Sequence, residues 1–134
     1  MASITELRQA SELEIAELQA LLDQDTNNSV RSVRNGSEFL GETVLVILHD
    51  GEYAGFCTFR SGGHEIFPLV VFDRFRRKGI GFSAMQQLIG MLRKNGFQEV
   101  GIEVLPGAET FWKKVFAGFP ETAHFGGKKF TYAL

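Results

Sequence analysis

The sequence predicts a single α/β domain that spans residues 1–134, in which strands and helices alternate. The chain has 134 residues, of which 44% are hydrophobic and 22% charged, a composition that suits one globular core. Apolar residues recur at helical spacing in residues 11–25 and 82–95, and runs rich in valine and isoleucine lie between them. Because a strand and a helix also flank a basic, glycine-containing loop, we expect helices to pack on a sheet.

The N-terminal part is expected to hold a short extended segment, residues 4–9, and then a helix, residues 11–25. Ser11 is a favourable N-cap and Glu14 follows three residues later, which is the pattern of a capping box. The apolar stripe of this helix consists of Leu13, Ala16, Leu18, Leu21 and Leu22. After a polar break, residues 30–37 are predicted to form a short second helix.

Three strands are expected in the middle of the chain. Residues 43–49 and 52–60 form a hairpin, since Asp and Gly at 50–51 both tolerate the positive φ of a tight turn. The third strand, residues 64–72, is mostly apolar on both faces and is therefore expected to be central. Pro68 has no N–H to give to a neighbouring strand, so it indicates an edge, a bulge or a place where strands part.

The C-terminal half is predicted to continue the alternation of helices and strands. A helix over residues 82–95 ends at Asn-Gly, and residues 97–105 follow as a strand. A further helix covers residues 108–117, after which residues 122–125 and 128–132 form a last hairpin around a Gly-Gly turn.

The basic loop, residues 76–81, is the strongest candidate for a binding site. It reads Arg-Arg-Lys-Gly-Ile-Gly and precedes a helix, whose first turn leaves N–H groups unpaired and carries a partial positive charge. Glycines let an anion approach the backbone, and the basic side chains add full charges, so the loop suits phosphate. The alternative is an ordinary solvated turn.

The charge and composition of the chain argue against several classes of binding partner. The formal net charge is −2 and the pI is about 5.9, which does not favour nucleic acid or an anionic membrane. Cys57 is the only cysteine, which excludes an internal disulfide and fits a reducing compartment. The first residues do not read as a signal peptide and no apolar run is long enough to span a bilayer. We therefore expect a cytoplasmic protein, a monomer or a homodimer, and no metal, because His49 and His124 lack metal-ligand spacing.

Three segments match a known family in sequence. They are residues 51–56, then Leu69-x-Val71 followed by Arg76-x-x-Gly79-x-Gly81, and Ala108-x-x-Phe111-Trp112-x-Lys114. Over nearly its whole length the chain resembles the GNAT superfamily of acyl-CoA-dependent N-acetyltransferases, whose acyl-CoA motif is R/Q-x-x-G-x-G/A. The resemblance implies a mixed, mostly antiparallel sheet of six to seven strands, splayed at its centre, with helices on both faces.

The resemblance also implies a place for acetyl-CoA as co-substrate. Its pyrophosphate is expected on the backbone amides of Arg77, Lys78, Gly79, Ile80 and Gly81, with Arg76 alongside. Its pantetheine arm is expected along the backbone of Leu69, Val70 and Val71, where Pro68 marks the parting of the strands. One N–H of this strand would polarise the thioester carbonyl, a contribution of about 3 kcal/mol.

Glu65 is the candidate general base, since an ammonium must lose a proton before it can attack. By alternation it shares a face with Phe67, Leu69 and Val71, and it lies where histone-type members of the superfamily carry a glutamate base. The alternative is an ordinary charged residue at a strand start. Family members often have tyrosine where this chain has Trp112 and asparagine where it has Leu105. Trp112 is expected to pack beside the cofactor.

We therefore predict an N-acetyltransferase that moves an acetyl group from acetyl-CoA to a primary amine by direct attack. The sequence does not identify the acceptor amine, which belongs either to a small molecule or to a protein lysine or N-terminus. Two alternatives remain, an acyl-CoA-binding module that has lost turnover and a protein-interaction domain on the same scaffold.

Overall fold

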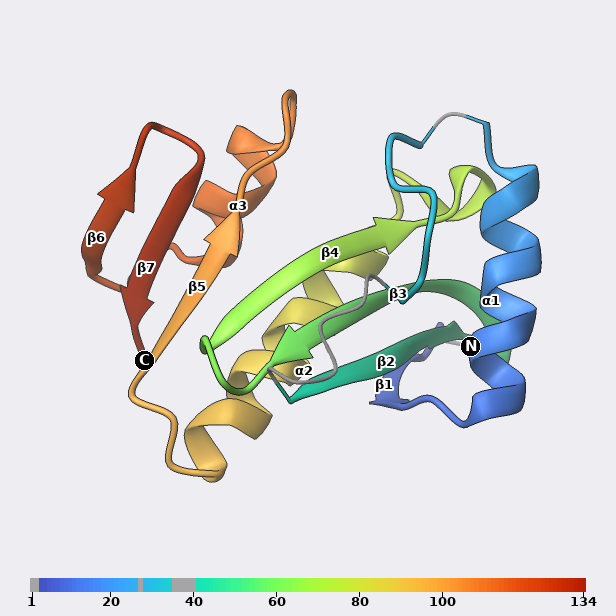
Figure 1. Cartoon of the computed structure of the whole chain (residues 1–134), viewed down its shortest axis with the longest axis horizontal. Coiled ribbons are helices and arrows are strands. Elements are labelled where there is room, and N and C mark those ends of the chain that lie inside the picture. The colour runs from blue at the N-terminus through green and yellow to red at the C-terminus, as the bar shows by residue number, and fades with distance from the viewer. Residues whose placement is uncertain (1–2, 27, 35–40) are drawn as a thin grey trace.

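The computed structural model describes residues 3–26, 28–34 and 41–134. Within these ranges a sheet of seven strands carries three α-helices (Figure 1). The strands are β1 (Thr5–Gln9), β2 (Glu42–His49), β3 (Glu52–Arg60), β4 (Glu65–Val71), β5 (Glu99–Glu103), β6 (Glu121–Phe125) and β7 (Lys129–Ala133). The α-helices are α1 (Glu12–Gln24), α2 (Ile80–Lys94) and α3 (Glu109–Val115), and a short 3-10 helix covers Asp73–Phe75. The predicted α/β class is confirmed.

The prediction of a second helix over residues 30–37 is wrong for its described part. Residues 30–34 contain no helix, and residues 35–37 lie outside the described ranges. Instead, side chains of α1 bond to the backbone of this segment: Gln19 accepts from the N–H of Val33 at 2.8 Å and donates to the Arg31 carbonyl at 3.1 Å. These bonds replace the ones a helix would have supplied.

The sheet has the order β1-β2-β3-β4-β5-β7-β6, and its one parallel pair is β4 with β5. That pair is short, because only Glu65 with Gly101 and Ile66 with Ile102 are in register. Beyond these residues β4 and β5 diverge, and Figure 1 shows the gap widening toward the end of β4. The expected splay at the centre of the sheet is therefore present.

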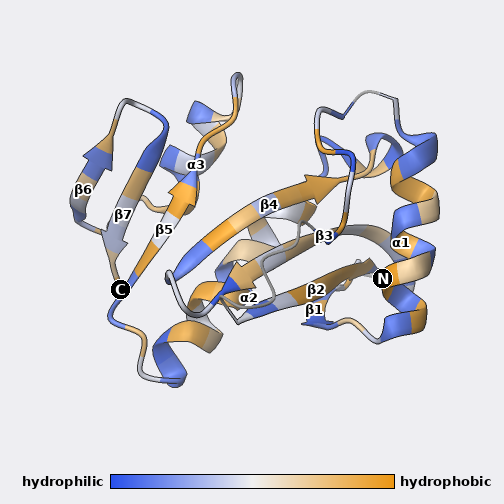
Figure 2. Ribbon diagram, in the orientation of Figure 1, coloured by the Kyte–Doolittle hydropathy of each residue, from blue (hydrophilic) through white to orange (hydrophobic). Residues whose placement is uncertain are grey.

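Helices cover both faces of the sheet near its centre. Residues 54–59 of β3 are all buried, and since neighbouring side chains in a strand point to opposite faces, both faces must be covered. α1 contacts β2 and β3, whereas α2 contacts β1 and β4 and runs behind the sheet in Figure 1. Figure 2 shows the hydrophobic residues gathered along β2, β3 and β4, where this core lies.

A β-bulge in β4 explains Pro68 and resets the faces of the strand. Phe59 faces Ile66 and Cys57 faces Leu69, so a step of two residues on β3 matches a step of three on β4. The extra residue lies at positions 67–68, where a proline without an N–H is tolerated.

The bulge also overturns one expectation. Cys57 and Phe59 lie on the same face of β3, so their partners Leu69 and Ile66 share a face as well. Glu65 is opposite Arg60 and therefore lies on the other face of the sheet from Leu69 and Val71. Simple alternation had placed it with them, and it fails because the extra residue shifts the alternation by one.

Candidate functional site

The start of α2 is an anion-binding geometry built from backbone. Gly79 is its N-cap with φ of 75°, a left-handed conformation that favours glycine, and no side chain caps the helix. The first turn holds no acidic residue. The N–H groups of Ile80, Gly81 and Phe82 have no partners within the helix, so this end combines free donors with the positive end of the dipole.

A cavity of about 600 Å³ lies against this helix start. It is bordered by the end of β4, the loop after it, the first turn of α2, the segment that leads into α3, and α3 itself. Its lining comprises Asn28, Ser29, Leu69, Val70, Val71, Phe75, Arg76, Arg77, Gly79, Ile80, Gly81, Phe82, Leu105, Pro106, Gly107, Ala108, Phe111 and Lys114. Of the residues predicted to bind the cofactor, only Lys78 and Trp112 are missing from this lining.

The backbone of β4 faces the cavity with unpaired polar groups. The Phe72 N–H donates to the Ala54 carbonyl at 2.8 Å, so the hydrogen-bonded pairs of β3 and β4 are Ala54 with Phe72 and, two residues on, Phe56 with Val70. The N–H and C=O groups of Leu69 and Val71 therefore point away from β3, toward the gap left by β5.

Arg76 occupies one of these groups. Its Nε donates to the Val71 carbonyl at 2.8 Å, and its two terminal nitrogens lie 3.2 Å from Asp73 Oδ1 and 3.4 Å from Asp25 Oδ2. The guanidinium thus ties the loop to the end of β4, and its charge is shared with two carboxylates. The side chains of Arg77 and Lys78 are both exposed, but only Arg77 of the two lines the cavity.

Gly81 lets α2 approach both β4 and α3. A Cβ placed on it would lie 3.3 Å from a ring carbon of Phe111 and 3.4 Å from a methyl carbon of Val71. A larger residue here would disturb the packing as well as the site. Gly79 faces open space, so its backbone is accessible from the cavity, whereas Gly81 serves close packing.

A second, smaller cavity of about 90 Å³ lies where β4 and β5 diverge. It is lined by Ile66, Phe67, Leu69, Glu103, Leu105, Ala108, Phe111 and Trp112. Because Leu69, Leu105, Ala108 and Phe111 line both cavities, the smaller one adjoins the larger. Trp112 is buried here and stacks on Phe116 at 6.1 Å between ring centres, so it forms the inner wall of the gap.

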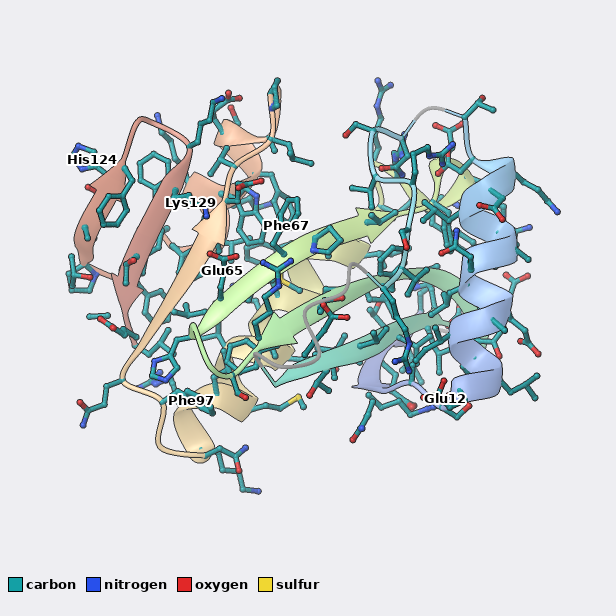
Figure 3. All side chains as sticks on the ribbon, viewed as in Figure 1. Glu12, Glu65, Phe67, Phe97, His124 and Lys129 are labelled. Atoms are coloured by element: carbon teal, nitrogen blue, oxygen red, sulfur yellow. The ribbon has the colours of Figure 1, made fainter. Side chains whose placement is uncertain are left out.

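The face of the sheet away from α2 and α3 carries a cluster of charges beside this gap. Arg60 donates to Glu65 at 3.0 Å, and Lys129 Nζ lies 3.9 Å from Glu65 Oε2 and 3.9 Å from Glu103 Oε1. Figure 3 shows Glu65 and Lys129 directed toward each other across β5, with Phe67 next along β4. We call Arg60, Glu65, Glu103 and Lys129 the charged cluster.

The sequence reasoning missed Glu103, which lines the smaller cavity while Glu65 does not. Ile66 pairs with Ile102 across the parallel strands, so Glu103 follows directly after the last paired position of β5. An acidic residue alternating with apolar residues in this strand was visible in the sequence, but only the register brings it to the gap. Phe111 and Lys114 were part of a matched motif, and the structure adds that both border the larger cavity.

No tyrosine stands at the gap in the described part of the chain. Tyr132 stacks flat on Phe116 at 4.3 Å, and burial raises its pKa. A hydrogen bond to Glu17 is the main cause that raises the pKa of Tyr53. Neither tyrosine lines either cavity. Neither is therefore placed to act as the tyrosine that family members often have where this chain has Trp112.

Cys57 is a core residue and not a nucleophile. Cys57 is fully buried, and desolvation raises its pKa to about 12, so its thiol stays protonated and unreactive at neutral pH.

Among the described residues no group of three or more His, Cys, Asp or Glu side chains could hold a metal ion. None of the helices described is long and apolar enough to cross a membrane.

Solved structures of low sequence identity share this fold. An acetyltransferase of the GNAT family from Staphylococcus aureus Mu50 matches with a TM-score of 0.68 at 9% identity, covering 98% of this chain and 99% of that chain. The PaiA N-acetyltransferase from Thermoplasma acidophilum, solved with coenzyme A, matches with a TM-score of 0.67 at 13% identity, covering 97% and 98%. The GNAT family N-acetyltransferase YhbS from Escherichia coli, also solved with CoA, matches with a TM-score of 0.72 at 16% identity, covering 99% and 83%.

No curated protein matches the chain in sequence. The sequence model of the acetyltransferase (GNAT) family, by contrast, matches residues 5–117. That span contains the loop before α2, the open end of β4 and the whole of α3, which together form the larger cavity. The chain therefore belongs to the GNAT family of acetyltransferases.

Proposed function

We propose that this protein transfers an acetyl group from acetyl-CoA to a primary amine by direct attack. One observation carries the proposal: a single cavity joins the uncapped start of α2 to the backbone N–H groups of Leu69 and Val71, which have no partner strand. A long, narrow ligand with a diphosphate at one end and amide groups along its arm fits such a site, and acetyl-CoA has that chemistry.

The residues present fit each part of this co-substrate. The amides from Arg77 to Gly81 suit the diphosphate, because free N–H donors and the helix dipole act together there. The N–H and C=O of Leu69 and the N–H of Val71 suit the amides of the pantetheine arm, since they face a gap without a partner strand. The thioester then lies toward the smaller cavity, with Phe111 and Trp112 as apolar wall.

The acceptor reaches the thioester from the face that carries the charged cluster. Glu65 takes the first proton that the ammonium must lose, directly or through water, and the neutral nitrogen attacks the thioester carbonyl. The nitrogen gives up its second proton to solvent as the C–S bond breaks. The N–H of Leu69 or Val71 stabilises the negative charge on the oxygen, a contribution of about 3 kcal/mol. A thiol has a pKa of about 8.5, so CoA can leave as thiolate without a phenol to protonate it.

Binding and turnover are tested separately. CoA at a hundred times its Kd should stabilise the protein by about 2.7 kcal/mol against unfolding, measured by denaturant titration. Thiol release from acetyl-CoA with a panel of small amines and lysine-containing peptides then reports turnover. Stabilisation without release on any amine would favour the acyl-CoA-binding module, and neither effect would favour the interaction domain.

A further inference from the structure

Lys129 is placed unlike the other lysines of the described chain. It begins β7 and pairs with Glu103 of β5, so both side chains lie on the face away from α2 and α3. Its Nζ lies 3.9 Å from both Glu65 and Glu103, which hold it between two carboxylates. Glu103 in turn lines the cavity in the parting of β4 and β5. An amine, two proton acceptors and the gap are therefore adjacent.

The contacts of Lys129 are loose enough to allow movement. Both ion pairs are long, and 51% of the side chain is exposed, so little free energy opposes a rotation of the amine toward the gap. The adjacent Lys128 is also exposed, but none of its side-chain contacts joins it to the gap among the interactions described. Lys114 borders the larger cavity from α3, where its amine lies 4.7 Å from the Phe82 ring centre, on the side of the sheet opposite the carboxylates.

We infer that Lys129 is itself an acetyl acceptor, modified in cis by the same site. This inference rests on the proposed function. Glu103 or Glu65 takes a proton from the ammonium of Lys129, and the freed lone pair attacks the thioester carbon of acetyl-CoA. The C–N bond forms, the nitrogen of the tetrahedral intermediate gives up its second proton to solvent, and the C–S bond breaks, so that CoA leaves as thiolate and is protonated by solvent. The product is an uncharged acetamide on Lys129.

Acetylation of Lys129 changes the charge that a second acceptor meets. The two carboxylates lose the cation between them, whereas Arg60, which donates to Glu65, stays in place. The face beside the gap then attracts a cationic amine more strongly. Modification of Lys129 therefore raises the apparent affinity for such an acceptor.

The experiment incubates the full chain with acetyl-CoA alone and follows each lysine by peptide mass spectrometry. Lys129 should be acetylated on the order of tenfold faster than Lys128, because Lys129 has its amine beside Glu103, which lines the gap, and Lys128 has no such contact among the interactions described. The first-order rate should not change with protein concentration, and excess CoA should suppress it. Acetyl phosphate, which reacts chemically with exposed amines, serves as the control and should label both lysines alike.

Two variants make the result specific. Lys128→Arg should leave labelling of Lys129 unchanged, and Glu103→Gln should lower it. Equal labelling of the two lysines by acetyl-CoA, or a rate that rises with protein concentration, would overturn the inference.

Thiol release with external amines is measured in parallel on Lys129→Arg. Release by this variant, combined with no selective labelling of Lys129 in the unmodified chain, overturns the inference and leaves the proposed function intact. No release with any amine and no stabilisation by CoA overturns both.

Discussion

Glu65 carries the proposed proton transfer, although its carboxylate already has a cation at 3.0 Å in Arg60. Glu65→Gln keeps the shape of the side chain and removes the base. We expect kcat to fall by about 10² to 10⁴, with a much smaller change in the Kd for CoA, because the cofactor contacts lie elsewhere. Steady-state kinetics and CoA titration calorimetry measure the two quantities.

Glu103→Gln is the companion substitution that distinguishes the two carboxylates, since Glu103 lies on the same face and contacts the same lysine. A loss of kcat confined to Glu103→Gln would move the base role to Glu103, which borders the gap. Full activity of both variants at neutral pH would remove the charged cluster from proton transfer.

Cys57 gives a second prediction at the scale of one residue. Burial raises its pKa to about 12, so the thiolate is absent from the folded protein near neutral pH. We expect iodoacetamide at pH 8 to leave the native protein unlabelled and to alkylate it after unfolding in urea. Rapid labelling of native protein, or an acetyl thioester on Cys57 after incubation with acetyl-CoA, would contradict its assignment as a core residue.

At the scale of elements, α1 is fastened by a capping box that also binds Arg8. Glu14 accepts from Arg8 and from the Ser11 N–H, and the bond from Arg8 is the main cause that lowers its pKa from 4.5 to about 2. Because the folded pKa is depressed, the stabilisation is present above pH 4.5 and is lost as pH falls from 4.5 to 2.

Glu14→Gln should therefore be less stable than the unmodified protein at pH 7, and the difference should shrink as pH falls toward 2. Urea unfolding at a series of pH values measures it. As a reference, Ser11→Ala removes the other half of the box and should cost about 1 kcal/mol at pH 7. A difference for Glu14→Gln that stayed constant with pH would show that the carboxylate charge does not contribute.

A charge-reversal substitution tests the loop before α2 better than a substitution of one of its glycines. Gly81 contacts Phe111 and Val71 too closely for a large substituent, so a glutamate there would disturb the fold itself. Arg77→Glu reverses an exposed charge in the loop instead and should weaken CoA binding roughly 3- to 10-fold, an effect that added salt reduces.

Arg93→Glu reverses the same charge on an exposed residue at the opposite end of α2 and serves as the control. Its Kd for CoA should stay close to that of the unmodified protein, since the first turn of the helix is unchanged. Equal Kd values for Arg77→Glu and Arg93→Glu would show that the loop charge does not act on the cofactor.

For the whole molecule, local patterns in the sequence were enough to predict most elements. The capping box of α1, the Asp-Gly hairpin and the Arg-x-x-Gly-x-Gly loop are each set by neighbours within a few residues. The prediction failed over residues 30–34, where the backbone bonds to Gln19 of α1 instead of to itself. Helix propensity, which depends on neighbouring residues, cannot reveal a hydrogen bond between segments that are separated in the sequence.

The candidate site was predictable in its backbone and less so in its side chains. Strand, loop and helix follow each other in sequence, so residues 69–71 and 76–81 are predicted to form one site, and all of them except Lys78 line one cavity. The face of Glu65, by contrast, depends on a single extra residue at positions 67–68, which only the pairing with β3 reveals. Glu103 depends likewise on the register of β5 against β4.

The parted strands leave a row of unbonded amides in the middle of the sheet, which has a consequence for hydrogen–deuterium exchange. Val70 donates across to β3 and should exchange slowly, whereas its neighbours Leu69 and Val71 should exchange rapidly, although all three belong to a central strand. Saturation with CoA should slow exchange at Leu69 and Val71 and leave Val70 unchanged, as amide-resolved NMR can follow. On the proposed function, the N–H groups of Leu69 and Val71 would gain hydrogen-bond partners only while CoA is bound.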